Sequence, residues 1–334
     1  MAVLLADISA LEFWRYAAHV KRVPTSSARR VLEASLEKPS FQEVERLLAN
    51  GFSFLSDPVH LLVPDEGSRC RAERVLSHVA PSESFCRDVV RIKEGLYVVE
   101  PEVCLLELAV ALPFPQLLEV VFEFCGEYAR SVGDFKEIAR RAPLTSVSKL
   151  EFFLDRVGCV HGSRAMRKAV RFALDRSRSP METVTVVFLC LPVRMGGYGL
   201  PNPVMNAVIP VPAKDRPFVK KSYYECDLYW PEAKFAIEYD SNLHHTGATR
   251  IAEDASRRVD LAYLGVEVAT LTQQQAYDRR EMDRIARLLA KRLGKRMRAE
   301  RIDIATQNDL RSCLLGPWHE EDDSKTHGQN RRLW

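Results

Sequence analysis

A short hairpin that carries carboxylates inside its strands constrains the fold of this chain more than any other segment. It lies in the run ECDLYWPEAKFAIEYD, residues 225–240. Pro231 suits a tight turn, and the runs on either side alternate in the manner of strands. Because side chains face their neighbours across a hairpin, we expect Asp227 to lie beside Glu238. Like charges on adjacent strands repel, so this pair of acids favours a divalent cation such as Mg²⁺, which takes carboxylate ligands. Inward charges that protect an edge strand would explain the same residues without a metal, and so would ion pairs of Asp227 with Lys234 and of Glu238 with an arginine.

Composition and length set wider limits. The chain has 334 residues, of which 46% are hydrophobic and 28% charged, which is typical of a globular protein of about two domains. No apolar run is long enough to span a bilayer, and the start of the chain lacks the basic region of a signal peptide, so we expect a cytoplasmic protein without a membrane partner. The 8 cysteines are scattered singly, which favours reduced thiols over a zinc cluster. The net charge of +3 does not by itself predict a nucleic-acid partner.

The pattern along the chain predicts two units and a tail. Residues 1–145 read as an α+β domain, with helices expected at 29–36 and 71–78 among others. In this domain, His60 and His78 have no ligand-type residue at metal-binding spacing, so they are interpreted as ordinary histidines. Residues 146–300 read as an α/β domain in which helices flank a small mixed sheet. Residues 301–334 lack periodicity and are predicted to form a flexible tail.

Glu182 has two roles open to it. The run Ser179-Pro-Met-Glu182 fits the start of a helix, with Ser179 as the capping residue and Pro180 at the first helical position. A capping glutamate needs no other task. If its carboxylate also faces the hairpin, Glu182 can join the acidic pair.

Two further groups extend the candidate site. His245 follows the hairpin in a polar loop, where it is either an exposed side chain or a proton-transfer group. On the helix expected at 249–264, Arg257 lies four residues after Glu253, and a salt-bridged solvent face is favoured there over a phosphate contact. The helix expected at 277–293 carries a basic stripe, either a solvated face or a contact for a phosphate backbone. The residues of this stripe are Arg280, Arg284, Arg287 and Lys291.

The second unit resembles the PD-(D/E)xK nuclease superfamily, and within it the very-short-patch-repair-like endonuclease domain. The resemblance covers about residues 145–295, and several short motifs carry it in order. These are Ser179-Pro-Met-Glu182, Cys226-Asp227-Leu228, Ala236-Ile-Glu-Tyr-Asp-Ser241, His244-His245, Asp254-Ala-Ser-Arg257, Leu261, Gly265 and the strand expected at 266–271. The resemblance implies a restriction-endonuclease-like core that uses Mg²⁺ or Mn²⁺.

The same resemblance assigns roles to individual residues. It implies that Asp227 and Glu238 are metal ligands, that Glu182 completes the metal shell, and that His245 assists proton transfer. One departure matters: Asp240 occupies the position, two residues after the second acid, where the superfamily has lysine. Asp240 would then help to orient the metal shell, and Lys234 is a candidate substitute for the missing lysine.

The function expected from these residues is metal-dependent cleavage of DNA by an endonuclease. The alternative is a DNA-binding regulator whose nuclease fold has lost activity. The first unit is similar to antitoxins of the abortive-infection type in the run LYVVEPEVCLLELA, residues 96–109. This similarity implies a role in phage defence or a toxin–antitoxin pair, with a protein partner for the first unit.

Overall fold

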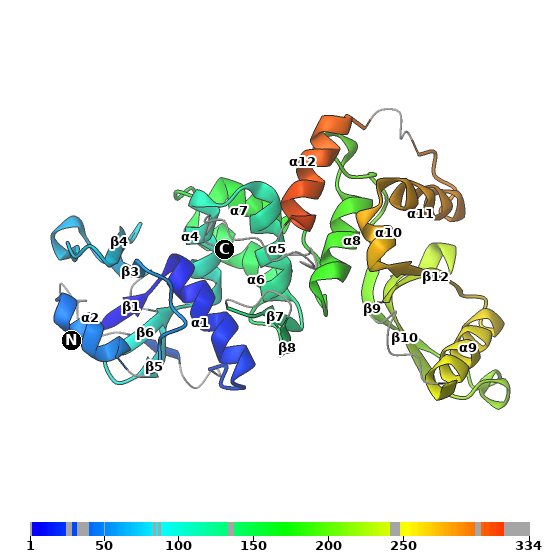
Figure 1. Ribbon diagram of the computed structural model, residues 1–334, viewed down its shortest axis with the longest axis horizontal. Helices are drawn as coiled ribbons and strands as arrows, with labels where there is room; N and C mark the ends of the chain where they lie inside the picture. The colour runs from blue at the N-terminus through cyan, green and yellow to red at the C-terminus, as the bar shows by residue number, and fades with distance from the viewer. Residues whose placement is uncertain are drawn as a thin grey trace, which may run out of the picture. The chain divides into compact units, whose positions relative to one another are not determined.

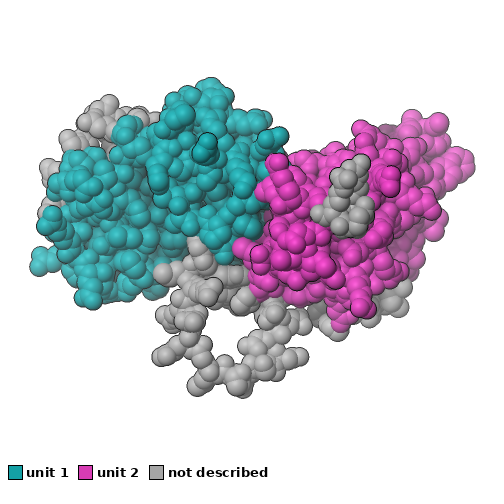
Figure 2. All heavy atoms as spheres, turned by 90° about the horizontal axis from the view of Figure 1, so that it is seen from above, with its two compact units in different colours: residues 1–173, 317–334 teal, residues 174–316 magenta. Residues whose placement is uncertain are grey.

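Two compact units make up the protein in the computed structural model, and the first covers Met1–Ala173 while the second covers Leu174–Gly316 (Figures 1 and 2). The structure describes residues 2–24, 29–31, 40–49, 51–82, 85, 88–132, 137–240, 248–297 and 302–316. The division falls later than the boundary expected at residue 145, so the helices α6 (Val147–Val157) and α7 (Ser163–Val170) belong to the first unit.

Unit 1 is built on a six-stranded mixed sheet in the order β2-β5-β6-β1-β3-β4. The strand bounds are β1 Val3–Leu5, β2 Arg29–Val31, β3 Val59–Val63, β4 Val75–Val79, β5 Asp88–Lys93 and β6 Leu96–Val99. All three residues of β1 are buried, as expected for a central strand with apolar side chains on both faces. β1 pairs in parallel with β6 and antiparallel with β3, so it fixes the middle of the sheet.

Helices complete unit 1. The helices are α1 Asp7–His19, α2 Phe41–Leu48, α4 Pro101–Ala111 and α5 Phe114–Cys125, followed by α6 and α7. A small pair of strands, β7 (Tyr128–Arg130) and β8 (Ile138–Arg140), follows α5. The close approach of α7 to α4 explains the later boundary: a Cβ added at Gly162 would lie 2.5 Å from the carbonyl oxygen of Leu106.

Two helix predictions in unit 1 are wrong. Residues 29–31 form β2, and the helix expected at 71–78 is replaced by β4, which pairs in parallel with β3. Within β4 the burial alternates, because Val75 and Ser77 are buried while Leu76 is exposed. The partner strand is distant in sequence, so a local pattern of apolar residues could not identify the pairing.

Unit 2 contains a four-stranded sheet in the order β12-β11-β10-β9. A helix comes first, α8 (Pro180–Cys190), and then three antiparallel strands, β9 (Val204–Pro210), β10 (Tyr223–Trp230) and β11 (Phe235–Asp240). The helix α9 (Ala248–Tyr263) leads to β12 (Glu267–Thr272), which pairs in parallel with β11. The prediction of a small mixed sheet flanked by helices is therefore confirmed.

One buried cluster of unit 2 joins the sheet to α9, which is yellow in Figure 1. Cys226, Ala236 and Leu261 belong to one buried cluster, and Tyr229 contacts the same cluster. Strict alternation along β10 would put Cys226 and Tyr229 on opposite faces. The strand therefore departs from strict alternation, and the departure falls around Asp227.

Three helices close unit 2, namely α10 (Gln273–Tyr277), α11 (Arg279–Arg292) and α12 (Ile304–Leu315). α10 and α11 replace the single helix expected at 277–293, since Asp278 caps the start of α11 with its side chain. α12 corrects the prediction of a tail from residue 301: Asp303 caps this helix, and Leu310 and Leu314 are buried four residues apart. Residues 317–334 of the expected tail lie outside the described residues.

Candidate active site

Three carboxylates of unit 2 are neighbours, one from each of α8, β10 and β11. They are Glu182, Asp227 and Glu238. Asp227 is the common neighbour of Glu182 and Glu238. Burial and then the negative charge of Asp227 raise the pKa of Glu182, and burial together with the charge of Glu238 raises the pKa of Asp227. The sequence-based grouping of these acids is thus reproduced by the fold.

The hairpin brings Asp227 to the point where its two strands separate. Leu228 and Ile237 form the last pair of the ladder between β10 and β11, so the next position along places Asp227 opposite Glu238. At this position the backbone N–H of Tyr239 donates to the carboxylate of Asp227 over 2.9 Å. The Asp227 carboxylate therefore accepts the hydrogen bond that a backbone carbonyl accepts in a regular ladder. This hydrogen bond holds the carboxylate at the edge of the ladder.

Glu182 serves as a helix cap and as a member of the acidic group at the same time. Its backbone N–H donates to the Ser179 hydroxyl over 3.2 Å, and that hydroxyl donates back to its carboxylate over 2.9 Å. The other carboxylate oxygen accepts from the backbone N–H of Arg178 and from Nδ2 of Asn206, which is 2.7 Å away. The side chain is buried, and the pKa of Glu182 is about 7 because burial and Asp227 outweigh these hydrogen bonds.

Asn206 is a site residue that sequence reasoning missed. It lies in the middle of β9 with φ of 46°, a left-handed conformation that asparagine tolerates better than most residues. Its side chain is buried and joins Glu182 to the backbone carbonyl of Arg176. A polar residue in the middle of the apolar strand VMNAVIP was the available signal.

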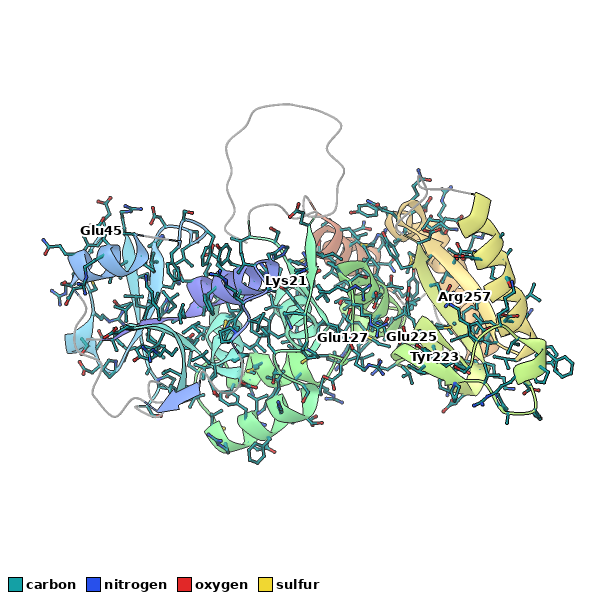
Figure 3. The ribbon with its side chains drawn as sticks, turned by 90° about the horizontal axis from the view of Figure 1, so that it is seen from below. Lys21, Glu45, Glu127, Tyr223, Glu225 and Arg257 are labelled. Carbon is teal, nitrogen blue, oxygen red and sulfur yellow. The ribbon has the colours of Figure 1, made fainter. Side chains whose placement is uncertain are left out.

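Two arginines neutralise neighbouring acids. Arg257 of α9 lies 2.5 Å from Glu238 and also donates to the backbone carbonyl of Glu225; Figure 3 labels Arg257 and Glu225. Arg178 pairs with the Glu225 carboxylate at 3.0 Å. The pairing of Arg257 replaces the expected solvent-facing pair with Glu253.

An open cleft of about 690 Å³ lies against Asp227 and is rich in positive charge. Four cationic side chains line it, namely Arg178, Lys220, Lys221 and Arg257. The acids of its wall are Asp227 and Glu225, and Asn206 separates the cleft from Glu182. The excess of cations suits a polyanion such as a nucleic-acid backbone. The sequence did not single out Lys220 and Lys221.

A divalent cation is the group that the nuclease resemblance implies, and the donor set supplies oxygen ligands of the kind that Mg²⁺ takes. The raised pKa values of Glu182 and Asp227 indicate negative charge that a cation would compensate. Glu238 fits less well, because Arg257 already binds its carboxylate. Within the part of the chain that the structure describes, the three acids are not a group whose ligand atoms all lie within 4.8 Å of one another. Asp227, whose side chain lines the cleft, is therefore the acid best placed for a cation, with Glu182 beside it.

The other candidates from the sequence are placed less closely. Lys234 lies in the turn with φ of 47°, and its Nζ lies beside Gly265. Glu238 lies four positions further along the chain, about 13 Å on a strand, so the structure does not bring Lys234 to the acids. Asp240 ends β11 opposite Thr272 of β12. His245 lies outside the described residues.

The basic stripe is exposed on α11. Arg280, Arg287 and Lys291 lie on the solvent side of this helix, and Arg284 is also exposed but pairs with Glu281 at 2.7 Å. The opposite face is buried through Met282, Ile285 and Leu289. A row of exposed cations is thus available to a phosphate backbone.

A second group of ligand-type side chains lies in unit 1, where the sequence predicted none. Nδ1 of His60 and Nε2 of His78 are 2.9 Å apart, and the carboxylate of Asp7 lies 3.6 Å from His78 and 3.9 Å from His60. The sequence pattern indicated ordinary histidines without ligand-type neighbours, and the fold places His60 and His78 beside each other and beside Asp7. They come from two parallel strands whose pairing the sequence analysis missed.

The comparisons with known proteins leave the family open. No protein-family model matches the chain, and no significant match was found among curated proteins or among solved structures. Among the helices that the structure describes, none has the length and apolar character needed to cross a bilayer.

Proposed function

We propose that unit 2 is a metal-dependent endonuclease that hydrolyses phosphodiester bonds of DNA. The observation that carries this proposal is the meeting of Glu182, Asp227 and Glu238 around Asp227, which lines a cleft whose wall holds four cationic side chains. This chemistry requires acidic side chains that bind a cation and basic side chains that bind phosphate. Both kinds occur side by side in unit 2.

The order of elements in unit 2 supports the same proposal. A helix, three antiparallel strands, a second helix and a fourth strand parallel to the third follow one another along the chain. The resemblance to the PD-(D/E)xK superfamily leads us to expect a core of this kind, with the acids on the first helix and on the second and third strands. Glu182, Asp227 and Glu238 occupy those elements.

In this proposal the site residues have separate roles. Asp227 and Glu182 would hold a divalent cation, and such an ion, when bound, would supply an activated water and stabilise negative charge on the phosphate. Asn206 orients the carboxylate of Glu182, and Arg257 orients Glu238. Arg178, Lys220 and Lys221 bind phosphates of the backbone on either side of the cleaved bond.

Cleavage of supercoiled plasmid with Mg²⁺ or Mn²⁺ tests the proposal. We expect the native chain to give relaxed or linear product and Asp227→Ala to give none, because the residue shared by the acidic group is lost. The matched control is Glu232→Ala, which removes an exposed acid from the turn of the same hairpin and should cleave normally. Retained cleavage by a folded Asp227→Ala variant would refute the assignment.

Two observations favour a second function, a DNA-binding protein without nuclease activity. Arg257 occupies the carboxylate of Glu238, and Asp240 stands where the superfamily has lysine. In that case the chain binds DNA without metal, the binding weakens as salt rises, and no cleavage occurs with either metal. The similarity of unit 1 to antitoxins fits this regulator and would give unit 1 a protein partner.

A further inference from the structure

We propose that Asp7, His60 and His78 form a Zn²⁺ site in unit 1, separate from the acidic group of unit 2. Three elements of the same fold supply the ligands: Asp7 begins α1, His60 lies on β3 and His78 on β4. Two imidazoles and a carboxylate are a ligand set that Zn²⁺ takes in proteins, with a fourth position left for water. Within the described residues, this is the group whose ligand atoms all lie within 4.8 Å of one another.

The spacing of the ligand atoms fits a single zinc ion. Zinc lies about 2.0–2.2 Å from nitrogen and oxygen ligands, so tetrahedral ligand atoms are roughly 3.3 Å apart. The three separations in the group are 2.9, 3.6 and 3.9 Å, which lie on both sides of that value. Shifts of a few tenths of an ångström in three side chains would therefore be enough.

A hydrogen bond between the two imidazoles does not account for the carboxylate. The 2.9 Å contact between His60 and His78 is a normal hydrogen-bond length. However, the same oxygen of Asp7, Oδ2, lies 3.6 Å from one ring and 3.9 Å from the other, which is too far for a hydrogen bond to either. An oxygen placed at ligand spacing from both nitrogens is what a shared metal ion requires.

Hydrogen bonds hold the backbone of Asp7 and His60 in place before an ion binds. Asp7 has φ of 47°, an uncommon conformation for a residue with a side chain, and such strain occurs where the surroundings enforce it. Its backbone N–H donates to Oε2 of Glu107 over 2.9 Å, and the backbone N–H of His60 donates to the hydroxyl of Ser9 over the same distance. These contacts from α4 and α1 hold the two ligands in place before any ion binds, as supporting residues do in metal sites.

The pairing of the strands gives the two histidines the same direction. In the parallel ladder of β3 and β4, Leu62 pairs with His78, and His60 lies two residues before Leu62. Residues two apart share a face of the sheet, so both rings lie on one side. The side chain of His78 is 29% exposed, which leaves the group accessible to an ion from solvent.

Zinc titration of the full-length chain tests the site. After dialysis against a chelator, we expect the native chain to bind one more equivalent of Zn²⁺ than His78→Ala, and also one more than Asp7→Asn, which keeps the shape of the side chain but not its charge. His161→Ala is the matched control, because it removes an exposed histidine of the same unit and should bind as the native chain does. Asp227→Ala should also retain this equivalent, which separates the zinc site from the proposed nuclease site.

Two readouts keep the test independent of folding. Circular dichroism identifies variants that fold, and Co²⁺ bound to the native chain should give the strong visible absorption of a tetrahedral site, which both His78→Ala and Asp7→Asn should lose. Zn²⁺ should also raise the melting temperature of the native chain and of His161→Ala, but not of the ligand variants. Equal zinc stoichiometry in the native chain and in folded His78→Ala and Asp7→Asn would overturn the proposal.

Discussion

At the scale of single residues, Glu182 predicts how stability depends on pH. Its pKa rises from 4.5 to about 7 on folding because burial, and then Asp227, disfavour the charged form. The folded state therefore holds a proton that the unfolded state has lost between these values, and the free energy of unfolding falls as pH rises through this window. The loss is roughly 3 kcal/mol, as an order of magnitude. Glu182→Gln removes this titration, so in EDTA we expect it to gain stability relative to the native chain from pH 4.5 to pH 8.

The measurement is urea unfolding of both chains at several pH values, and the quantity compared is the difference between them. Glu232→Gln, on the exposed turn, is the control for loss of one carboxylate and should leave the difference flat. Parallel curves for the native chain and Glu182→Gln would show that the environment of Glu182 is not the one described here.

At the scale of elements, a substitution at Gly162 tests how closely α7 packs against α4. Its φ is 83°, and an added Cβ would lie 2.5 Å from the carbonyl oxygen of Leu106 in α4. Gly162→Ala therefore combines backbone strain with a clash against the Leu106 carbonyl, which is backbone and cannot rotate away as a side chain can. We expect this variant to lower the free energy of unfolding by about 2–4 kcal/mol. Gly51→Ala is the control, because it has φ of 88° but open space around the Cβ. It should cost only about 1 kcal/mol in the same thermal unfolding experiment. Equal losses would mean that α7 does not contact α4 closely.

Elements also show where sequence reasoning succeeds. The hairpin around Pro231 was predictable because alternation and turn chemistry are local, and the start of α8 was predictable because Ser179 and Glu182 cap it within one turn. The strand β4 was not predictable in this way, since its partner β3 is remote in sequence. The same limit hid the site residues Asn206 and Lys220, whose roles depend on packing between elements that sequence spacing does not reveal.

At the scale of the whole molecule, positive charge is concentrated in patches rather than spread over the surface. The net charge is only +3, too small to attract DNA without concentrated patches. Two such patches lie in unit 2, the cleft with Lys220 and Lys221 and the exposed stripe with Arg287 and Lys291. If each patch contacts phosphates, each patch adds to the salt dependence of DNA binding in proportion to its cations.

The double variants Lys220→Ala/Lys221→Ala and Arg287→Ala/Lys291→Ala separate the two patches. Each lost phosphate contact lowers the slope of log affinity against log salt by about 0.9, so we expect each double variant to lower it by roughly 2. Only the cleft pair should also slow cleavage at saturating DNA, because the cleft contains Asp227 and the stripe serves binding alone. Fluorescence anisotropy across a salt series gives the slopes, and the plasmid assay gives the rates. An unchanged slope for the stripe pair would assign those cations to a solvated helix face, and an unchanged slope for the cleft pair would remove the phosphate-binding role on which the proposed nuclease depends.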